Sequence, residues 1–263
     1  MVLFTALVAA ALLLTLLYLN AATRVFQLLG LSPLGAAIVI IASLLGGMVN
    51  IPLTRRRLAV ENPLLANLPA WLRQIMPLFY YFPPAVVEQV VAVNVGGALI
   101  PITFSIYLFM LPTTPFVAAI SATILVAAIA KLFARPLPGQ GITLPAFIPP
   151  LVAAITAHIF VVWLGGPAAS AAPVAYISGT LGTLIGADLL SLPRVLRGSL
   201  LGTSARPIRQ RMASAQADDV VDDMNEASML PESARTVVSI GGAGVFDGIF
   251  VTSVLAPLLA ALL

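Results

Sequence analysis

Seven long apolar stretches dominate the sequence and limit its fold more than any other feature. Windows of about 19 residues give apolar segments near 2–20, 34–54, 86–111, 114–134, 143–164, 169–191 and 236–263. Hydrophobic residues make up 60% of the chain and charged residues 9%, and the mean hydropathy is +1.06. Because a bilayer-spanning helix needs about 20 apolar residues, this composition is typical of an integral membrane protein. We predict an all-α polytopic transmembrane helical bundle of about seven spans, some broken or kinked, in a single domain over residues 1–263.

The basic residues predict how these segments are oriented. Of the 13 lysines and arginines, all but Arg24 follow the second, fourth or sixth segment. By the positive-inside bias those connections are cytoplasmic, which places the N-terminus inside and the C-terminus outside. No basic region precedes the first segment, so we interpret it as a retained span and not as a cleaved leader. The expected location is the cell membrane, with the lipid bilayer as the first partner and no nucleic acid as a partner.

Two of the predicted cytoplasmic connections are long. Residues 55–85 combine arginines with aromatic residues such as Trp71 and Tyr80, a mixture that favours a segment lying along the lipid headgroups. Residues 192–235 contain an acidic run at 218–226, where carboxylates one helical turn apart have the chemistry to hold a divalent cation. A solvated helix or linker is the interpretation we favour for that run. We predict no metal site and no cofactor, since one histidine and no cysteine offer too few ligands for zinc.

Several predicted spans contain residues that disturb helices. The second ends in GGMVNIP, the third contains NVGGALIP, and the fifth opens with LPAFIPP. Non-helical backbone at membrane depth persists only where it is buried in protein or lines a wet cavity, so we expect a polar interior that opens toward the cytoplasm. The candidate substrate-binding residues at this interior are Asn50, Glu88, Asn94, Pro145, Gly244 and Gly248.

Two isolated aspartates are the leading candidates for chemistry. Asp188 lies in GTLIGADLL and Asp247 in GGAGVFDGIF. A charged aspartate at the centre of a membrane helix costs about 2.5–3.5 kcal/mol, so a chain rarely carries two without a use for them. If they meet, they share one proton, because like charges in a poorly solvated site do not both ionise. The ionised member can take a proton from water while the protonated member polarises a peptide carbonyl, which predicts a catalytic pair for peptide hydrolysis. His158 is interpreted as a polar residue packed between helices.

Residues 169–263 resemble the intramembrane aspartyl proteases, the presenilin and signal-peptide-peptidase group. That resemblance implies catalytic aspartates on the sixth and seventh spans, here Asp188 and Asp247, facing the cytoplasm across a long loop. Gly242, Gly244 and Asp247 look like a stretched Gly-x-Gly-Asp motif. The sequence departs from the family in having Ala187 where a tyrosine is usual, two additional residues before Asp247, and no two further spans with a Pro-Ala-Leu element.

GTLIGADLL, GGAGVFDGIF and the NIP and NVGGALIP turns are also similar to recurrent motifs of an uncharacterised family of prokaryotic multi-spanning membrane proteins, a domain of unknown function. This resemblance covers most of the chain and implies a fold without implying an activity.

Two other functions remain open. An ion-coupled secondary transporter also uses broken helices and membrane carboxylates near a substrate, and GGMVNIP and NVGGALIP weakly suggest an internal repeat of the kind such proteins carry. A non-catalytic assembly role is the third possibility. The expected partner beyond lipid is therefore a transmembrane peptide substrate or a small solute or ion.

Overall fold

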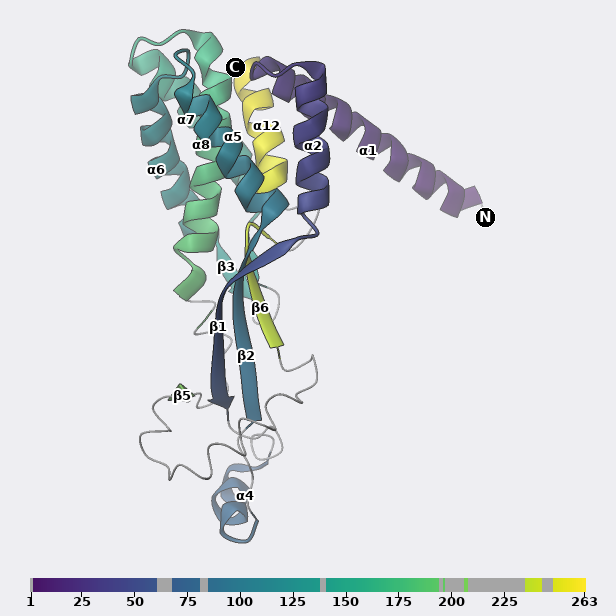
Figure 1. Cartoon of the computed structure of the whole chain (residues 1–263), viewed down its shortest axis with the longest axis vertical. Helices are drawn as coiled ribbons and strands as arrows, with labels where there is room; N and C mark the ends of the chain where they lie inside the picture. Colours follow the sequence, from purple (N-terminus) through teal and green to yellow (C-terminus); the bar gives the residue numbers. More distant parts are fainter. Residues whose placement is uncertain are drawn as a thin grey trace.

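The computed structural model of the chain describes residues 2–60, 68–80, 85–137, 141–193, 196, 206–207, 235–242 and 248–263. The described part is mostly helical, with a small β-sheet at one end of a helical bundle (Figure 1). The predicted helical bundle is thus confirmed, and the sheet is an addition that hydropathy did not reveal.

Within the described residues, a helix corresponds to each of the seven apolar segments. They are α1 (Val2–Leu28), α2 (Pro33–Gly46), α5 (Ile100–Met110), α6 (Phe116–Phe133), α7 (Ile148–Trp163), α8 (Ala171–Thr183) and α12 (Gly248–Leu262). A π-helix, η2 (Val95–Leu99), leads into α5, and a second, η4 (Leu184–Leu189), continues α8. A 3-10 turn, η3 (Ala168–Ser170), precedes α8. By length and composition, Phe4–Leu28, Phe116–Phe133 and Ala168–Leu189 are candidate membrane spans, and the other four helices are shorter and apolar.

Three of the predicted spans, the second, third and seventh, contain a β-strand at one end in addition to the helix. Strand β1 (Asn50–Val60) follows α2, β2 (Ala85–Asn94) precedes η2, and β6 (Arg235–Ile240) precedes α12. With β5 (Arg206–Pro207) they form a sheet of order β5-β1-β2-β6, in which β1 and β2 are antiparallel and β2 and β6 parallel. The β2 sequence AVVEQVVAVN is rich in valine, which favours strands, whereas hydropathy alone does not separate an apolar strand from an apolar helix.

The two long connections differ in how much of them is described. Residues 55–85 include the end of β1, a short helix α4 (Ala70–Ile75) and a 3-10 turn η1 (Met76–Leu78), and α4 lies beyond the end of the sheet that is far from the bundle (Figure 1). Trp71 and Tyr80 are exposed there. Most of residues 192–235, including the acidic run at 218–226, lies outside the described residues. A hairpin of β3 (Arg135–Leu137) and β4 (Gly141–Thr143) joins α6 to α7.

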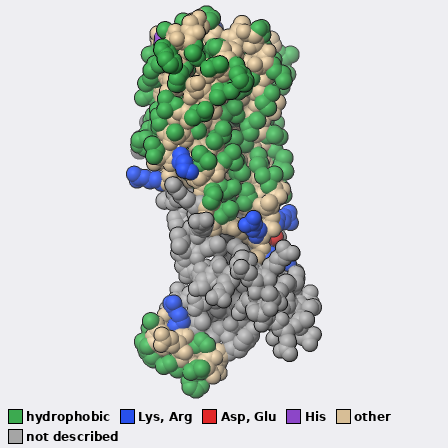
Figure 2. All heavy atoms as spheres, turned by 90° about the vertical axis from the view of Figure 1, so that its left-hand side faces the viewer, with side chains coloured by type: hydrophobic (Ala, Val, Ile, Leu, Met, Phe, Trp, Pro, Cys, Tyr) green, Lys and Arg blue, Asp and Glu red, His purple; other side chains and the backbone are tan. Residues whose placement is uncertain are grey.

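The helices alternate in direction, so the connections after the second, fourth and sixth lie at the sheet end and the C-terminus lies at the opposite end (Figure 1). On the face seen in Figure 2, lysine and arginine side chains gather at the sheet end of the bundle, and most of the bundle surface above them is hydrophobic. The predicted alternation and the charge asymmetry therefore agree with the arrangement of the helices.

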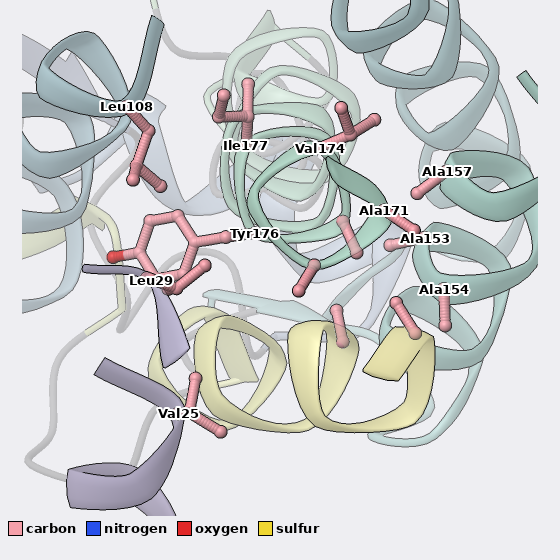
Figure 3. Close-up of a cluster of buried hydrophobic side chains, with 14 of the residues drawn as sticks. Val25, Leu29, Leu108, Ala153, Ala154, Ala157, Ala171, Val174, Tyr176 and Ile177 are labelled. Atoms are coloured by element: carbon pink, nitrogen blue, oxygen red, sulfur yellow. The ribbon is translucent and has the colours of Figure 1, made fainter. Parts of the chain in front are cut away.

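Helix α8 lies at the centre of the bundle and packs against α5, α6, α7 and α12. Small side chains allow this, and Figure 3 shows Ala153 and Ala157 of α7 beside α8. A Cβ added at Gly182 would lie 2.7 Å from the Cβ of Val126, so this glycine allows α6 to approach α8 closely. Gly182 thus serves helix packing, and η4, which continues α8 and carries Asp188, contacts β6 of the sheet.

Candidate functional site

Three places where a helix meets a strand lie together at the sheet end of the bundle: α2 into β1, β2 into α5, and β6 into α12 (Figure 1). Asn50 begins β1 and pairs with Asn94 at the end of β2. Because these strands are antiparallel, the motifs GGMVN and NVGG, which read in opposite directions, face each other. The two similar motifs are therefore the two places where the chain changes between helix and strand. We call these places helix breaks, and the two lie against each other.

Glycines bring the two breaks into backbone contact. A Cβ added at Gly96 would collide with the Ser43 carbonyl oxygen and the Gly47 nitrogen, and one at Gly46 would lie 2.9 Å from the Gly96 nitrogen. The Ser43 hydroxyl also donates to the Gly96 carbonyl oxygen at 2.8 Å. Only glycine fits at such a close approach of two backbones.

The fully buried side chain of Asn94 joins the two helix breaks by hydrogen bonds. Its Oδ1 accepts from the Gly97 N–H at 2.7 Å, and its Nδ2 donates to the Gly47 carbonyl oxygen at 2.8 Å and to Asn50 Oδ1 at 3.2 Å. These bonds satisfy backbone groups that the change from strand to helix leaves without partners, which would otherwise be costly in a buried place. Asn94 is thus a structural tie at the break.

Asp188 makes a similar hydrogen bond to the backbone at the third helix break, where β6 ends. It lies near the end of η4, is half-buried, and its Oδ2 accepts from the Gly241 N–H at 2.6 Å. Gly241 and Gly242 follow β6 with φ values of +84° and +74°, a turn that other residues rarely adopt. Because β6 forms an edge of the sheet, the Asp188 carboxylate bonds the backbone just where that edge strand ends.

Contacts from α6 hold η4 and so set the position of Asp188. A Cβ at Gly186 would collide with the Ala127 carbonyl oxygen, so the two backbones touch there. Lys131 Nζ donates to the Leu190 carbonyl oxygen at 2.9 Å, which places a cation at the end of the helix where carbonyl groups lack partners. π-Helical turns are frequently found at functional sites.

A hydroxyl links the third break to the other two. Ser239 of β6 donates from its Oγ to Asn50 Oδ1 at 2.7 Å, and Asn50 Oδ1 is the same atom that accepts from Asn94. One set of polar side chains therefore connects the ends of β1, β2 and β6, and Asp188 bonds the backbone two residues after Ser239. We call this set, Asn50, Asn94, Asp188, Ser239 and the Gly241 backbone, the junction network.

Of the candidate residues named from the sequence, the structure brings Asn50, Asn94 and Asp188 into the junction network. Asp247 and Gly244 lie outside the described residues, between Gly242 and Gly248. Gly248 is the exposed first residue of α12.

Two candidates lie elsewhere. Glu88 is six residues along β2 from Asn94, about 20 Å at the rise of a strand, and is in register with Arg57 and Arg235. Pro145 is exposed, and its carbonyl oxygen accepts from the Ile148 N–H at 3.2 Å at the start of α7. The junction network therefore contains two of the six candidate binding residues, Asn50 and Asn94.

Sequence reasoning missed Ser239, Gly241, Gly186 and Lys131. The Gly241–Gly242 pair after a valine-rich run is a signal for a strand that ends in a tight turn, and it was available from the sequence. The roles of Ser239 and Lys131 depend on which elements are neighbours, for which the sequence carried no local signal.

His158 is half-buried in α7, and its Nδ1 has no hydrogen-bond partner among the described residues. Across the same residues, no three of the His, Cys, Asp and Glu side chains come together in a way that could hold a metal ion.

Comparison with known proteins gives a family and nothing more specific. No curated protein and no solved structure matches the chain. The profile of one family matches residues 44–207 and 220–259, which include every residue of the junction network and the segment that carries Asp247. Since this match covers most of the chain, the protein belongs to the family described as "Protein of unknown function (DUF1614)".

Proposed function

We propose that this protein is an intramembrane hydrolase that cleaves membrane-embedded peptide bonds with Asp188 and Asp247 as an aspartyl pair. The observation that carries the proposal is the 2.6 Å bond from the Gly241 N–H to Asp188 Oδ2. Gly241 is six residues before Asp247 in the chain, so the segment that carries the second aspartate begins at the carboxylate of the first.

The surroundings of Asp188 suit this chemistry. Glu88 and Asp188 are the acidic residues within the described ranges, and of these two only Asp188 lies at the base of the bundle. It is half-buried, and Leu184 of the same π-helical turn and Ile240, next to Gly241, belong to an apolar cluster. The contacts from α6 at Gly186 and Leu190 fix the position of η4 and hence of the carboxylate, and catalytic groups require such positioning.

The reaction needs only water and the two carboxyl groups. One ionised carboxylate takes a proton from water as the water oxygen attacks the peptide carbonyl carbon, and the protonated carboxyl gives its proton to the carbonyl oxygen. As the C–N bond of the tetrahedral intermediate breaks, the carboxyl that took the proton from water gives it to the leaving nitrogen, and the other, now ionised, carboxylate takes a proton from a hydroxyl of the intermediate as the new carbonyl forms. Each carboxyl group ends the cycle able to start another.

In this proposal, the protein lies in the cell membrane, with its N-terminus in the cytoplasm and its C-terminus outside. The support is that basic residues gather at the sheet end, where the second, fourth and sixth connections lie. Because the chain has no cysteine, single cysteines placed at Thr54 and at Leu263 report the two sides. Labelling of position 54 from the outside would contradict this orientation.

The test of the activity is cleavage of a helical transmembrane reporter by the reconstituted protein. Asp188→Ala and Asp247→Ala are each expected to lower the cleavage rate by roughly 100-fold or more, which is within the range for loss of a general acid or base. His158→Ala removes another polar group of the bundle and serves as the control with an intact rate. Undiminished cleavage in both aspartate variants would remove the proposal.

Ion-coupled transport is the second candidate, and the helix breaks favour it. α2, α5 and α12 each meet a strand at the junction network, and broken helices of this kind present backbone groups to a solute. The measurement is proton- or sodium-dependent uptake into liposomes. Uptake that is lost in Asp188→Ala, in a protein that cleaves no reporter, would replace hydrolysis with transport.

A further inference from the structure

Strand β1 changes from an apolar to a basic surface within a few residues. Met48, Val49, Ile51 and Leu53 are large apolar side chains exposed to the surroundings, between 45% and 77% of their surface. Arg55, Arg56 and Arg57 follow at once and are also exposed. Only Thr54 lies between Leu53 and Arg55, which are about 7 Å apart along the strand, so the arginines border the apolar surface directly.

The three arginines do not share one face of the sheet. Arg56 is in register with Gln89, which is buried and donates from its Nε2 to the Leu196 carbonyl oxygen at 3.4 Å. Buried Val91, on the same face of β2, packs in a cluster with Leu192 and Leu196. The chain that follows η4 therefore packs on this face of the sheet at Gln89 and Val91, beside Arg56, which stays exposed.

Arg55 and Arg57 lie on the opposite face, in register with Val90 and Glu88. Both of these partners are only half-buried. Side chains two residues apart on a strand leave the same face at a spacing of about 7 Å, so the side chains of Arg55 and Arg57 start close enough for both to reach one ligand. Glu88 is in register with Arg57 on one side and with the backbone of Arg235 on the other.

Guanidinium groups bind phosphate through paired N–H donors, and two of them at this spacing can hold one phosphate group between them. Basic residues placed immediately next to membrane helices attract anionic lipids by about 1 kcal/mol each, which corresponds to roughly five-fold in affinity per residue. Arg55 and Arg57 lie at the border of an exposed apolar surface. A lipid whose acyl chains cover that surface would place its headgroup at this border.

We propose that Arg55 and Arg57 form a binding site for the phosphate of an anionic phospholipid headgroup, on the open face of β1 at the sheet end of the bundle. A free phosphate has the same recognition chemistry, but the apolar side chains from Met48 to Leu53 give acyl chains a surface beside the site. This inference does not depend on the proposed hydrolysis or on the partner of Asp188.

The experiment uses the full-length protein in a neutral detergent and titrates short-chain phosphatidylglycerol, short-chain phosphatidylcholine and inorganic phosphate. Native mass spectrometry counts bound lipid, and the shift in Tm gives an independent measure of binding. The wild-type protein is expected to bind phosphatidylglycerol at least ten-fold more tightly than phosphatidylcholine. Arg55→Gln/Arg57→Gln is expected to weaken phosphatidylglycerol binding by roughly 25-fold, from two contributions of roughly five-fold.

Arg56→Gln/Arg135→Gln is the charge-matched control, since it removes the same charge from positions that are exposed but not on this face. Phosphatidylglycerol binding by the control should change by less than three-fold. Equal losses in the two double variants would overturn the site, because they would show a response to net charge alone.

Two further results would also overturn it. One is an equal affinity for the two lipids, and the other is tight binding of inorganic phosphate that displaces phosphatidylglycerol. If the glutamine variant does not fold, Arg55→Lys/Arg57→Lys keeps the charge, and it should lose part of the preference because lysine lacks the paired donors.

Discussion

Asn94 and Asp188 each bond the backbone at neighbouring breaks, yet they differ in charge and in burial. Asn94 has no exposed surface and uses its amide for bonds to Gly47, Asn50 and Gly97. Asp188 is half-buried, sits on a π-helical turn and bonds the Gly241 N–H through one oxygen. A neutral amide with both ends engaged is a structural device, whereas a carboxylate with access to water can also transfer protons.

The comparison teaches that polar residues at helix breaks are not equivalent as functional candidates. From the sequence, Asn50, Asn94 and Asp188 are alike, since each is a short polar side chain in an apolar stretch with glycines nearby. The structure separates them by burial, by charge and by the groups they bond. Exchanging amide for carboxylate at each position is the most direct test of this distinction.

Asp188→Asn should produce the largest effect, on activity. The amide oxygen can still accept from the Gly241 N–H, so the fold should be kept, while proton transfer is lost and reporter cleavage falls by roughly 1,000-fold. The cleavage rate and the free energy of unfolding in mixed micelles are measured on one preparation. A variant that loses cleavage only because it loses more than about 2 kcal/mol of stability would make Asp188 resemble Asn94.

Asn94→Asp should produce the largest effect on stability. A carboxylate has no donor for the Gly47 carbonyl oxygen or for Asn50 Oδ1, and it places a charge where no side-chain surface is exposed. We expect a loss of about 3 kcal/mol or more in the free energy of unfolding. Unfolding in mixed micelles checks this, and a loss below about 1 kcal/mol would show that water reaches Asn94.

Gly96→Ala should destabilise the protein by about 1–3 kcal/mol through overpacking, because its Cβ would meet the Ser43 and Gly47 backbones. Gly248→Ala is the matched control. A Cβ there meets nothing within 4 Å, so its stability should be unchanged or slightly raised by the better helix propensity of alanine. Equal unfolding free energies for the two variants would mean that the crossing of the breaks is looser than described.

Ser239→Ala should have the smallest effect, about 1 kcal/mol, for the loss of one hydrogen bond to Asn50 that is open to solvent. Its informative readout is cleavage. If Ser239 only joins strands, the cleavage rate falls no more than the folded fraction does. A fall of ten-fold or more at full folding would instead mean that the link from Asn50 to β6 positions the segment between Gly241 and Gly248.

The helical bundle followed from the apolar segments, since each has a helix among the described residues. The strands did not, because Val90 to Val93 is as apolar as a helix would be and a hydropathy window does not detect period or pairing. Asn50, Asn94 and Asp188 were found by a local signal, a polar group in apolar sequence. Ser239, Gly186 and Lys131 were not, since each acts through a contact with a distant part of the chain.

The sequence by itself determined that the chain is built from apolar helices, that its basic residues concentrate at one end, and that a few polar side chains interrupt it. These properties are set by local composition, and composition is additive along the chain. Only the tertiary structure shows that three helix breaks meet, that the Asn94 side chain is fully buried, and that Asp188 accepts a hydrogen bond from Gly241. Those facts depend on strand pairing and on glycine contacts between segments more than 40 residues apart, and no local pattern specifies which partners will meet.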